Sequence, residues 1–217
     1  MVRLEKLYKK LSLQLNRLQT RAVDIEVKLG SVEPWRTRYM TESLIQDLWH
    51  TWCSFVRELV ISSCTGCITR NGSIIPARLA NNSWQRLGYE AKQAVYGNNI
   101  SPGRLLKSIR QEPTWGDQKN IIPILSVLAP ANKNELISAF GLPLRGPRHL
   151  QIVRNACMHK HGEIMLDMRT IQIYYLASNV KQPSELVWHT EAASKQIAFF
   201  RWLDDLKIIA DVGTSLP

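Results

Sequence analysis

The chain is poor in cysteine. Its 217 residues include four cysteines, and Cys64 and Cys67 form one CxxC pair. A structural zinc site normally takes four ligands, and no second CxxC or HxxxH pair follows at the distance typical of a zinc finger. Two interpretations of the pair stay open: reduced, partly buried thiols, or a zinc site that is completed by His159 and His161 much later in the chain.

Long apolar runs are also missing. No stretch reaches the roughly 20 apolar residues that a membrane-spanning helix needs. Arg3, Glu5 and Lys6 stand where a signal peptide would have its apolar region. Neither an internal repeat nor a low-complexity segment is present. These absences predict a cytoplasmic protein that has no membrane partner.

Acidic residues are outnumbered by basic ones. Asp and Glu total 18 against 28 Lys and Arg, which gives a formal net charge of +10. Such a charge favours polyanionic partners, and nucleic acid is the commonest of these, although a merely basic surface would give the same balance. Because 45% of the residues are hydrophobic and 21% are charged, the chain is expected to fold as one globular domain, with or without appendages.

The N-terminal residues carry the clearest periodicity in the chain. Two series of apolar residues repeat every seven positions, and Gly30 follows them as a stop signal. The pattern predicts one helix over residues 3–29, about 40 Å long at a rise of about 1.5 Å per residue. This helix packs either along a bundle or against a second copy of itself. The two series are Leu4, Leu11, Leu18 and Ile25, and Tyr8, Leu15, Ala22 and Leu29.

Further helices are expected downstream. Pro34 interrupts the chain, and a second long helix is predicted from about Thr41 to Cys64. Trp49 and Trp52 on this helix lie either in the core or in the wall of a cleft. Start and stop signals predict shorter helices over 77–95, after Ser101-Pro102, after Asn132, over 147–160 with Gly162 as the stop, and over 194–210.

Residues 163–190 have a less regular pattern. Strand-like alternation over 171–175 and 186–189 predicts a hairpin or an extended arm. The expected fold class is therefore all-α: a bundle of long antiparallel helices with a small extended or β segment in its C-terminal part. The bundle is assigned to residues 1–162, and residues 163–217 form a C-terminal extension that packs on the same domain.

One segment combines three side chains that suit RNA chemistry. Arg154, Asn155 and His159 fall on the helix predicted over 147–160. Residues four apart share a helix face, so Asn155 and His159 would be neighbours, and the long Arg154 side chain can reach the same spot. A histidine can take the proton of a ribose 2′-hydroxyl, an arginine can stabilise the charge that grows on the phosphate, and an amide can orient either group. This chemistry requires no metal and no other cofactor.

Further basic residues and a second histidine flank the trio. The candidates for contacts with RNA phosphates are Arg145, Arg148, His149 and Lys160. His161 also fits the looser spacing from the arginine, so it is the alternative to His159 as the catalytic histidine. A purely structural alternative is that Arg154 forms a surface ion pair and that His159 caps its helix.

Arg154-Asn155, three residues and then His159, late in a chain with long helices, resembles the signature of the HEPN superfamily (higher eukaryotes and prokaryotes nucleotide-binding). The resemblance implies a helical bundle and a homodimer, in which the motif helices of two subunits meet at a shared cleft. Many members are metal-independent ribonucleases of toxin–antitoxin and anti-phage systems, and others bind nucleotides or partners without catalysis. The resemblance does not extend over residues 163–217.

Two functions from different classes follow. The first is an endoribonuclease that cleaves RNA, such as tRNA or mRNA, by 2′-hydroxyl attack, and that acts as a toxin or anti-phage effector alongside an antitoxin or defence-system partner protein. The second is a non-catalytic module that binds a nucleotide or a partner in such a system. A DNA-binding helix-turn-helix is disfavoured, because the basic residues are dispersed and no short helix pair has the expected turn.

Overall fold

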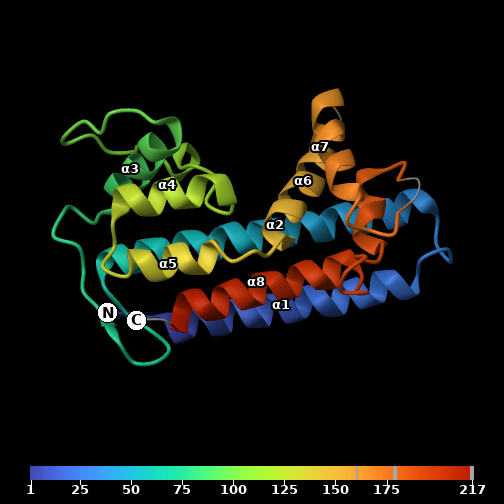
Figure 1. Ribbon diagram of the computed structural model, residues 1–217, viewed down its shortest axis with the longest axis horizontal. Helices are drawn as coiled ribbons and strands as arrows, with labels where there is room; N and C mark the ends of the chain where they lie inside the picture. Colours follow the sequence, from blue (N-terminus) through green and yellow to red (C-terminus); the bar gives the residue numbers. More distant parts are fainter. Residues whose placement is uncertain (160, 178–179, 216–217) are drawn as a thin grey trace. The chain divides into compact units, whose positions relative to one another are not determined.

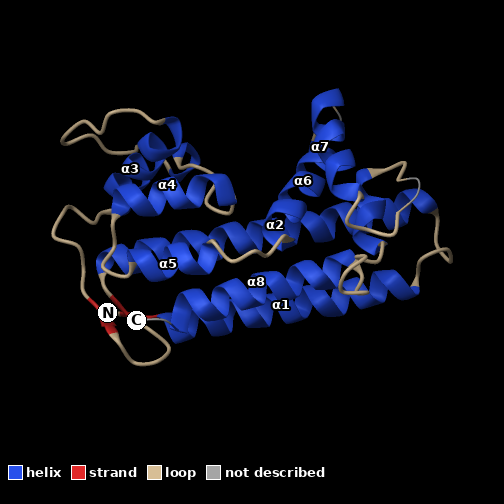
Figure 2. Ribbon diagram, in the orientation of Figure 1, coloured by secondary structure: helices blue, strands red, loops and turns tan. Residues whose placement is uncertain are grey.

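The computed structural model describes residues 1–159, 161–177 and 180–215, which are mostly helical (Figure 1, Figure 2). The mostly helical class expected from the sequence is therefore confirmed. The α-helices are α1 (Leu4–Val27), α2 (Pro34–Thr65), α3 (Trp84–Tyr96), α4 (Gln118–Leu128), α5 (Lys133–Phe140), α6 (Gly146–Met158), α7 (Gly162–Gln172) and α8 (Ala198–Ser215). Two short 3-10 helices are η1 (Ile109–Gln111) and η2 (Pro183–Trp188).

The chain divides into two compact units. Unit 1 comprises Met1–Leu11, Trp52–Pro143 and Ile208–Pro217, and unit 2 comprises Ser12–Thr51 and Leu144–Lys207. Helices α3, α4 and α5 lie in unit 1, whereas α6, α7 and η2 lie in unit 2. Each unit takes residues from both sides of position 162, so this grouping differs from the expected segments 1–162 and 163–217.

The long N-terminal helix forms nearly as predicted. The heptad positions from Leu4 to Ile25 are buried along α1, and Leu15 and Ala22 of the second series are fully buried. Helix α1 ends at Val27, and Gly30 adopts a left-handed backbone with φ of +78°. That conformation costs glycine little and most other residues more, which explains why a glycine lies just beyond the end of the helix.

Helix α2 begins earlier than predicted. Pro34 is its first residue, although the sequence placed the start near Thr41. Proline suits the first helical turn, because its missing N–H would have no partner there. Trp49 and Trp52 are 6% and 1% exposed, and the Trp52 indole N–H donates to the carbonyl oxygen of Gly116 at 3.3 Å. Both indoles therefore belong to the core and do not line an open cleft.

The small sheet lies in unit 1 and was not expected there. β1 (Val2–Arg3) runs parallel to β2 (Cys67–Ile68), which pairs antiparallel with β3 (Ile74–Ile75). In register, Val2 faces Cys67, and Ile68 faces Ile74. Strands of two residues leave no alternation for a sequence pattern to reveal, so this sheet depends on tertiary context.

The hairpin predicted over 171–175 and 186–189 does not form. Ile171 and Tyr175 are both buried and are four residues apart, which is a helical spacing, and α7 continues to Gln172. Residues 183–188 form η2. Among the described residues of this region, the β interactions are two isolated bridges, Tyr175 with Glu191 and Thr190 with Ile197. The β part of the C-terminal prediction is therefore wrong except for these bridges.

The helix predicted after Ser101-Pro102 is also absent from the structure. Arg86 Nη1 donates to the carbonyl oxygens of Ser101 and Arg104 at 2.9 and 3.0 Å, and the Ser101 N–H donates to the Tyr89 hydroxyl at 3.2 Å. These bonds from α3 satisfy the backbone of the segment in a non-helical conformation. In the residues that the structure describes, no helix is both long and apolar enough to cross a membrane.

Candidate functional site

The motif helix α6 is fixed at its first residue. The Gly146 N–H donates to Asp205 Oδ2 of α8 at 2.8 Å. A Cβ on Gly146 would lie 2.7 Å from the Cβ of Asp205 and 3.0 Å from the Cα of Trp202. These distances are shorter than a carbon–carbon contact allows, so only glycine lets the two helices approach this closely. This contact within unit 2 sets the start of the helix that carries the motif.

Arg154 and Asn155 are brought together as predicted. Arg154 Nη1 donates to Asn155 Oδ1 at 3.1 Å, and Arg154 Nε donates to Gln46 Oε1 on α2, also at 3.1 Å. Both motif side chains are partly buried. The amide oxygens of Asn155 and Gln46 therefore hold the guanidinium in place, and its remaining N–H groups can serve a bound anion.

His159 lies beyond the helix and not on its face. Helix α6 ends at Met158, and His159 is the capping residue, with φ of −128° and ψ of 88°. Its backbone N–H donates to the Asn155 carbonyl oxygen at 2.8 Å, and its side chain is exposed. The predicted helical face shared by Asn155 and His159 is therefore wrong, although the backbone bond still ties the histidine to the motif.

The alternative histidine occupies the same link between α6 and α7. His161 is exposed, and its backbone N–H donates to the His159 carbonyl oxygen at 2.8 Å. Gly162 is the first residue of α7, so it does not act as the predicted stop of the preceding helix. Lys160, a predicted RNA contact, lies outside the described residues. Both histidines therefore remain candidates for the acid–base group.

Two of the predicted phosphate contacts are accessible cations. Arg145 and Arg148 are exposed near the start of α6. The guanidinium carbon of Arg145 lies 4.0 Å from the centroid of the Tyr174 ring, a cation–π contact that steadies the side chain. An exposed, positioned guanidinium suits contact with an RNA phosphate.

His149 is not available for such a contact. It is 3% exposed, and its Nδ1 lies 2.5 Å from the Tyr175 hydroxyl. That hydroxyl also accepts a hydrogen bond from the Trp202 indole N–H at 2.8 Å, so its own proton is free to be donated to a neutral imidazole. The expectation that His149 binds RNA is therefore wrong, because the imidazole is part of a buried hydrogen-bond chain in unit 2.

Burial controls the protonation states of His149 and Tyr175. It lowers the pKa of His149 to about 4, with smaller contributions from the positive charges of Arg145 and Arg148. Burial also raises the pKa of the Tyr175 hydroxyl. Both effects favour the uncharged forms of the two side chains.

A dependence of stability on pH follows from His149. In the unfolded chain the pKa of His149 is near 6.5. As the pH falls below that value, the unfolded state binds a proton at His149 while the folded state does not, so the unfolded state is favoured. The stabilisation is complete above pH 6.5 and is lost as the pH falls toward about 4. At about 1.4 kcal/mol per pKa unit, the loss is at most about 3.5 kcal/mol.

The check is urea unfolding at pH 7 and at pH 4.5 for wild type and for His149→Gln. The glutamine can still accept the Tyr175 hydrogen bond but does not titrate, so the variant should lose less stability in acid. An equal acid loss in both proteins would show that His149 is not responsible.

The CxxC pair, Cys64 and Cys67, is buried, and its thiols are free. Burial raises the pKa of Cys64 to about 12. A thiol with such a pKa is protonated at neutral pH and is a weak nucleophile. In the described parts of the chain, no group of three or more His, Cys, Asp or Glu side chains could hold a metal ion.

A search of protein-family models, of curated proteins and of solved structures found no match to this chain. The interpretation of the site therefore rests on its own residues.

Proposed function

We propose that this protein is a metal-independent endoribonuclease of the HEPN type. The observation that carries the proposal is the arrangement around Arg154, whose guanidinium is held by Gln46 and Asn155 at 3.1 Å each. His159 lies one helical turn later, and its backbone N–H donates to the Asn155 carbonyl oxygen; its side chain is exposed. A positioned cation beside a group that can exchange protons is the minimum that RNA cleavage by an internal nucleophile requires.

The proposed reaction moves one proton at each end of the scissile bond. The His159 imidazole takes the proton of the ribose 2′-hydroxyl, and the oxygen attacks the adjacent phosphorus. The bond from phosphorus to the 5′-oxygen breaks, and that oxygen leaves with a proton from an acid such as the second histidine. The products are a 2′,3′-cyclic phosphate and a 5′-hydroxyl end. Arg154 would stabilise the negative charge that grows on the phosphate oxygens during the attack.

The surrounding residues would bind the substrate. Arg145 and Arg148 are exposed cations near the start of the motif helix, and the whole chain carries a net charge of +10. Phosphate contacts of this kind give affinity without sequence selectivity, and their contribution falls as the salt concentration rises. A homodimer would bring two motif segments together in a composite site. Its cellular role would be that of a toxin or anti-phage effector with an antitoxin or defence-system partner.

The direct test uses labelled RNA and excess EDTA. We expect the purified protein to cleave the RNA in the absence of divalent metal ions and to leave 2′,3′-cyclic phosphate ends, because the 2′-oxygen is the nucleophile. Treatment with a cyclic phosphodiesterase before end-labelling would identify these ends. Products with 3′-hydroxyl ends, or activity that appears only after Mg²⁺ is restored, would contradict the proposed mechanism.

A specific observation favours a second function, a non-catalytic binding module. The Arg154 guanidinium already has two amide partners, and His159 lies past the end of the helix. Such a site could bind an anionic group without positioning the histidine for proton transfer. If expression of the chain leaves a bacterial host unharmed and the purified protein leaves total RNA intact, this function is preferred over cleavage.

A further inference from the structure

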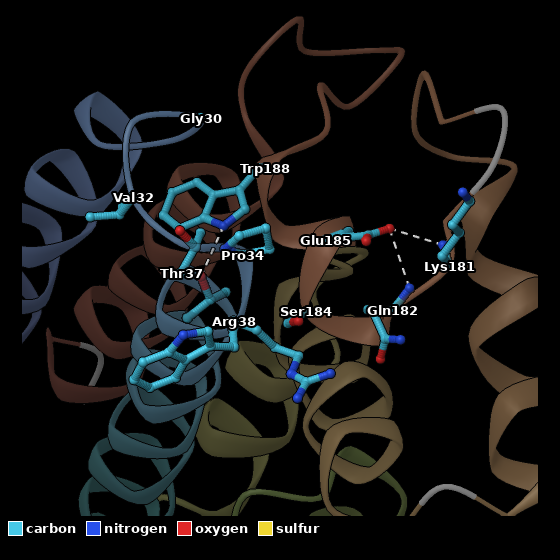
Figure 3. A pocket seen from close by; sticks show the side chains of 12 residues that line it. Gly30, Val32, Pro34, Thr37, Arg38, Lys181, Gln182, Ser184, Glu185 and Trp188 are labelled. Carbon is cyan, nitrogen blue, oxygen red and sulfur yellow. Dashed lines mark hydrogen bonds between the residues drawn. The ribbon is translucent and has the colours of Figure 1, made fainter.

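Unit 2 contains a cavity of about 530 Å³ that no motif indicated (Figure 3). It opens between the loop and first turns of α2, from Gly30 to Thr41, and the segment from Lys181 to Trp188. Its volume lies within the range of small-molecule sites, roughly 300 to 1,000 Å³. No residue of the RNA-cleavage motif lines it.

Two indole rings belong to its lining. Trp188 is held in place because its indole N–H donates to the buried Thr41 hydroxyl at 3.1 Å (Figure 3). Trp35 is 60% exposed, an unusual exposure for the largest aromatic side chain. An exposed indole and a hydrogen-bonded indole in one lining offer two aromatic surfaces to a planar ring.

Two cations lie at the same cavity. Arg38 extends from α2, and its Nε is 4.0 Å from Glu42 Oε1, too far for a hydrogen bond. The Glu42 oxygen itself has no hydrogen-bond partner in the described structure. Lys181 supplies the second cation from the opposite segment. The Arg38 guanidinium therefore keeps donors for an anionic ligand.

The acidic side chain in the lining has a structural role. Glu185 Oε2 accepts from the backbone N–H groups of Lys181 and Gln182 at 2.9 and 3.2 Å, as Figure 3 shows. These bonds fix the start of η2 and offset the carboxylate charge. The lining therefore offers two cationic side chains and one carboxylate that is already bonded to the backbone.

From these contacts we infer that the cavity binds a nucleotide. The nucleobase stacks on the indoles of Trp35 and Trp188, and the phosphate contacts Arg38 and Lys181. A planar ring joined to an anion matches a cavity in which both segments of the lining carry an aromatic and a cationic side chain. The nucleotide is either free or part of single-stranded RNA, and the binding does not depend on RNA cleavage by the motif.

The test is calorimetric titration of the full chain with two probes. The first kind of probe is a nucleoside 5′-monophosphate, and each of the common ones is titrated in turn. The second is a short 2′-O-methyl oligouridine, which cannot be cleaved through its 2′-oxygen. We expect Trp35→Ala and Arg38→Ala each to weaken binding about tenfold, the effect of losing one stacking or charged contact. Both side chains are exposed, so neither variant removes a part of the core.

Matched controls separate the cavity from general effects. Tyr39→Ala removes an aromatic ring that is 70% exposed on the same helix, and Arg17→Ala removes an exposed arginine of α1; neither residue lines the cavity. Both controls should bind within about twofold of wild type. If a mononucleotide binds wild type and the controls more tightly than the cavity variants, the ligand is a free nucleotide. If only the oligonucleotide shows this difference, the ligand is single-stranded RNA. Cavity variants that match their controls with both probes would overturn the proposal.

Discussion

His159→Ala should reduce RNA cleavage by about 10²- to 10⁴-fold, the usual contribution of a general acid–base residue. The side chain is exposed beyond the end of α6, so its removal should change the unfolding free energy by no more than about 0.5 kcal/mol. The loss should appear in the catalytic rate, since the arginines proposed to contact RNA are unchanged. Single-turnover cleavage of labelled RNA at saturating protein measures that rate directly.

His161→Ala is the companion variant. It removes a second exposed imidazole, two residues further on and before the start of α7. If His159 is the base and His161 the acid, His161→Ala should slow cleavage less than His159→Ala does, and it should act as a near-silent control if another group supplies the proton. The reverse pattern would assign the base to His161. Full cleavage by both single variants would contradict the involvement of either histidine in the reaction.

Local sequence patterns gave the long helices but not all their ends. Periodicity in α1 reflects burial along one side, and burial is what the structure shows from Leu4 to Ile25. The start of α2 was misplaced because proline has two roles: it breaks a helix when it lies in the interior, and it is favoured in the first turn. The presence of a proline does not by itself distinguish these roles. The hairpin near Tyr175 was predicted wrongly because apolar neighbours such as Ile173 gave an alternating pattern. They obscured the four-residue spacing of the buried side chains Ile171 and Tyr175.

The motif itself could be predicted only as a set of residue types. Arg154 and Asn155 are adjacent in the chain, so the long arginine side chain can reach the amide without any long-range contact. The partner that orients Arg154 is Gln46, 108 residues earlier, and no local pattern indicates it. His149 was predicted to contact RNA because its neighbours are charged. Its hydrogen-bond partner Tyr175, and the Trp202 indole that donates to Tyr175, are also far away in sequence.

The cavity of unit 2 had no sequence signal for the same reason. Trp35 and Arg38 lie on one helix, whereas Lys181 and Trp188 come from a segment that was expected to be extended. An exposed tryptophan close to a helix start was the one available hint, since exposure of that side chain is uncommon. Exposure is a property of the folded chain, so the hint becomes visible only in the structure.

Glu90→Gln should destabilise the protein by about 3–5 kcal/mol, the typical effect of breaking a buried ion pair by removing one partner. Glu90 Oε2 accepts from Arg78 Nη2 and its Oε1 accepts from Arg86 Nε, each at 2.6 Å. The three side chains are between 9% and 14% exposed. Glutamine keeps the shape but removes the charge, so two guanidinium groups would face each other without a counterion in a region of low dielectric.

Urea unfolding at pH 7 measures this effect, with Glu58→Gln as the matched control. Glu58 pairs with Lys10 at 2.9 Å, but the two side chains are 42% and 57% exposed, so losing the pair should cost about 1 kcal/mol or less. Added salt should weaken the Glu58 pair by screening and leave the Glu90 network nearly unchanged. Arg86 also holds the carbonyl oxygens of Ser101 and Arg104, so the Glu90 variant should expose this loop to protease earlier than the control does. Equal destabilisation by the two substitutions would mean that solvent reaches the Glu90 network, and that the charge at its centre contributes no more than a surface pair.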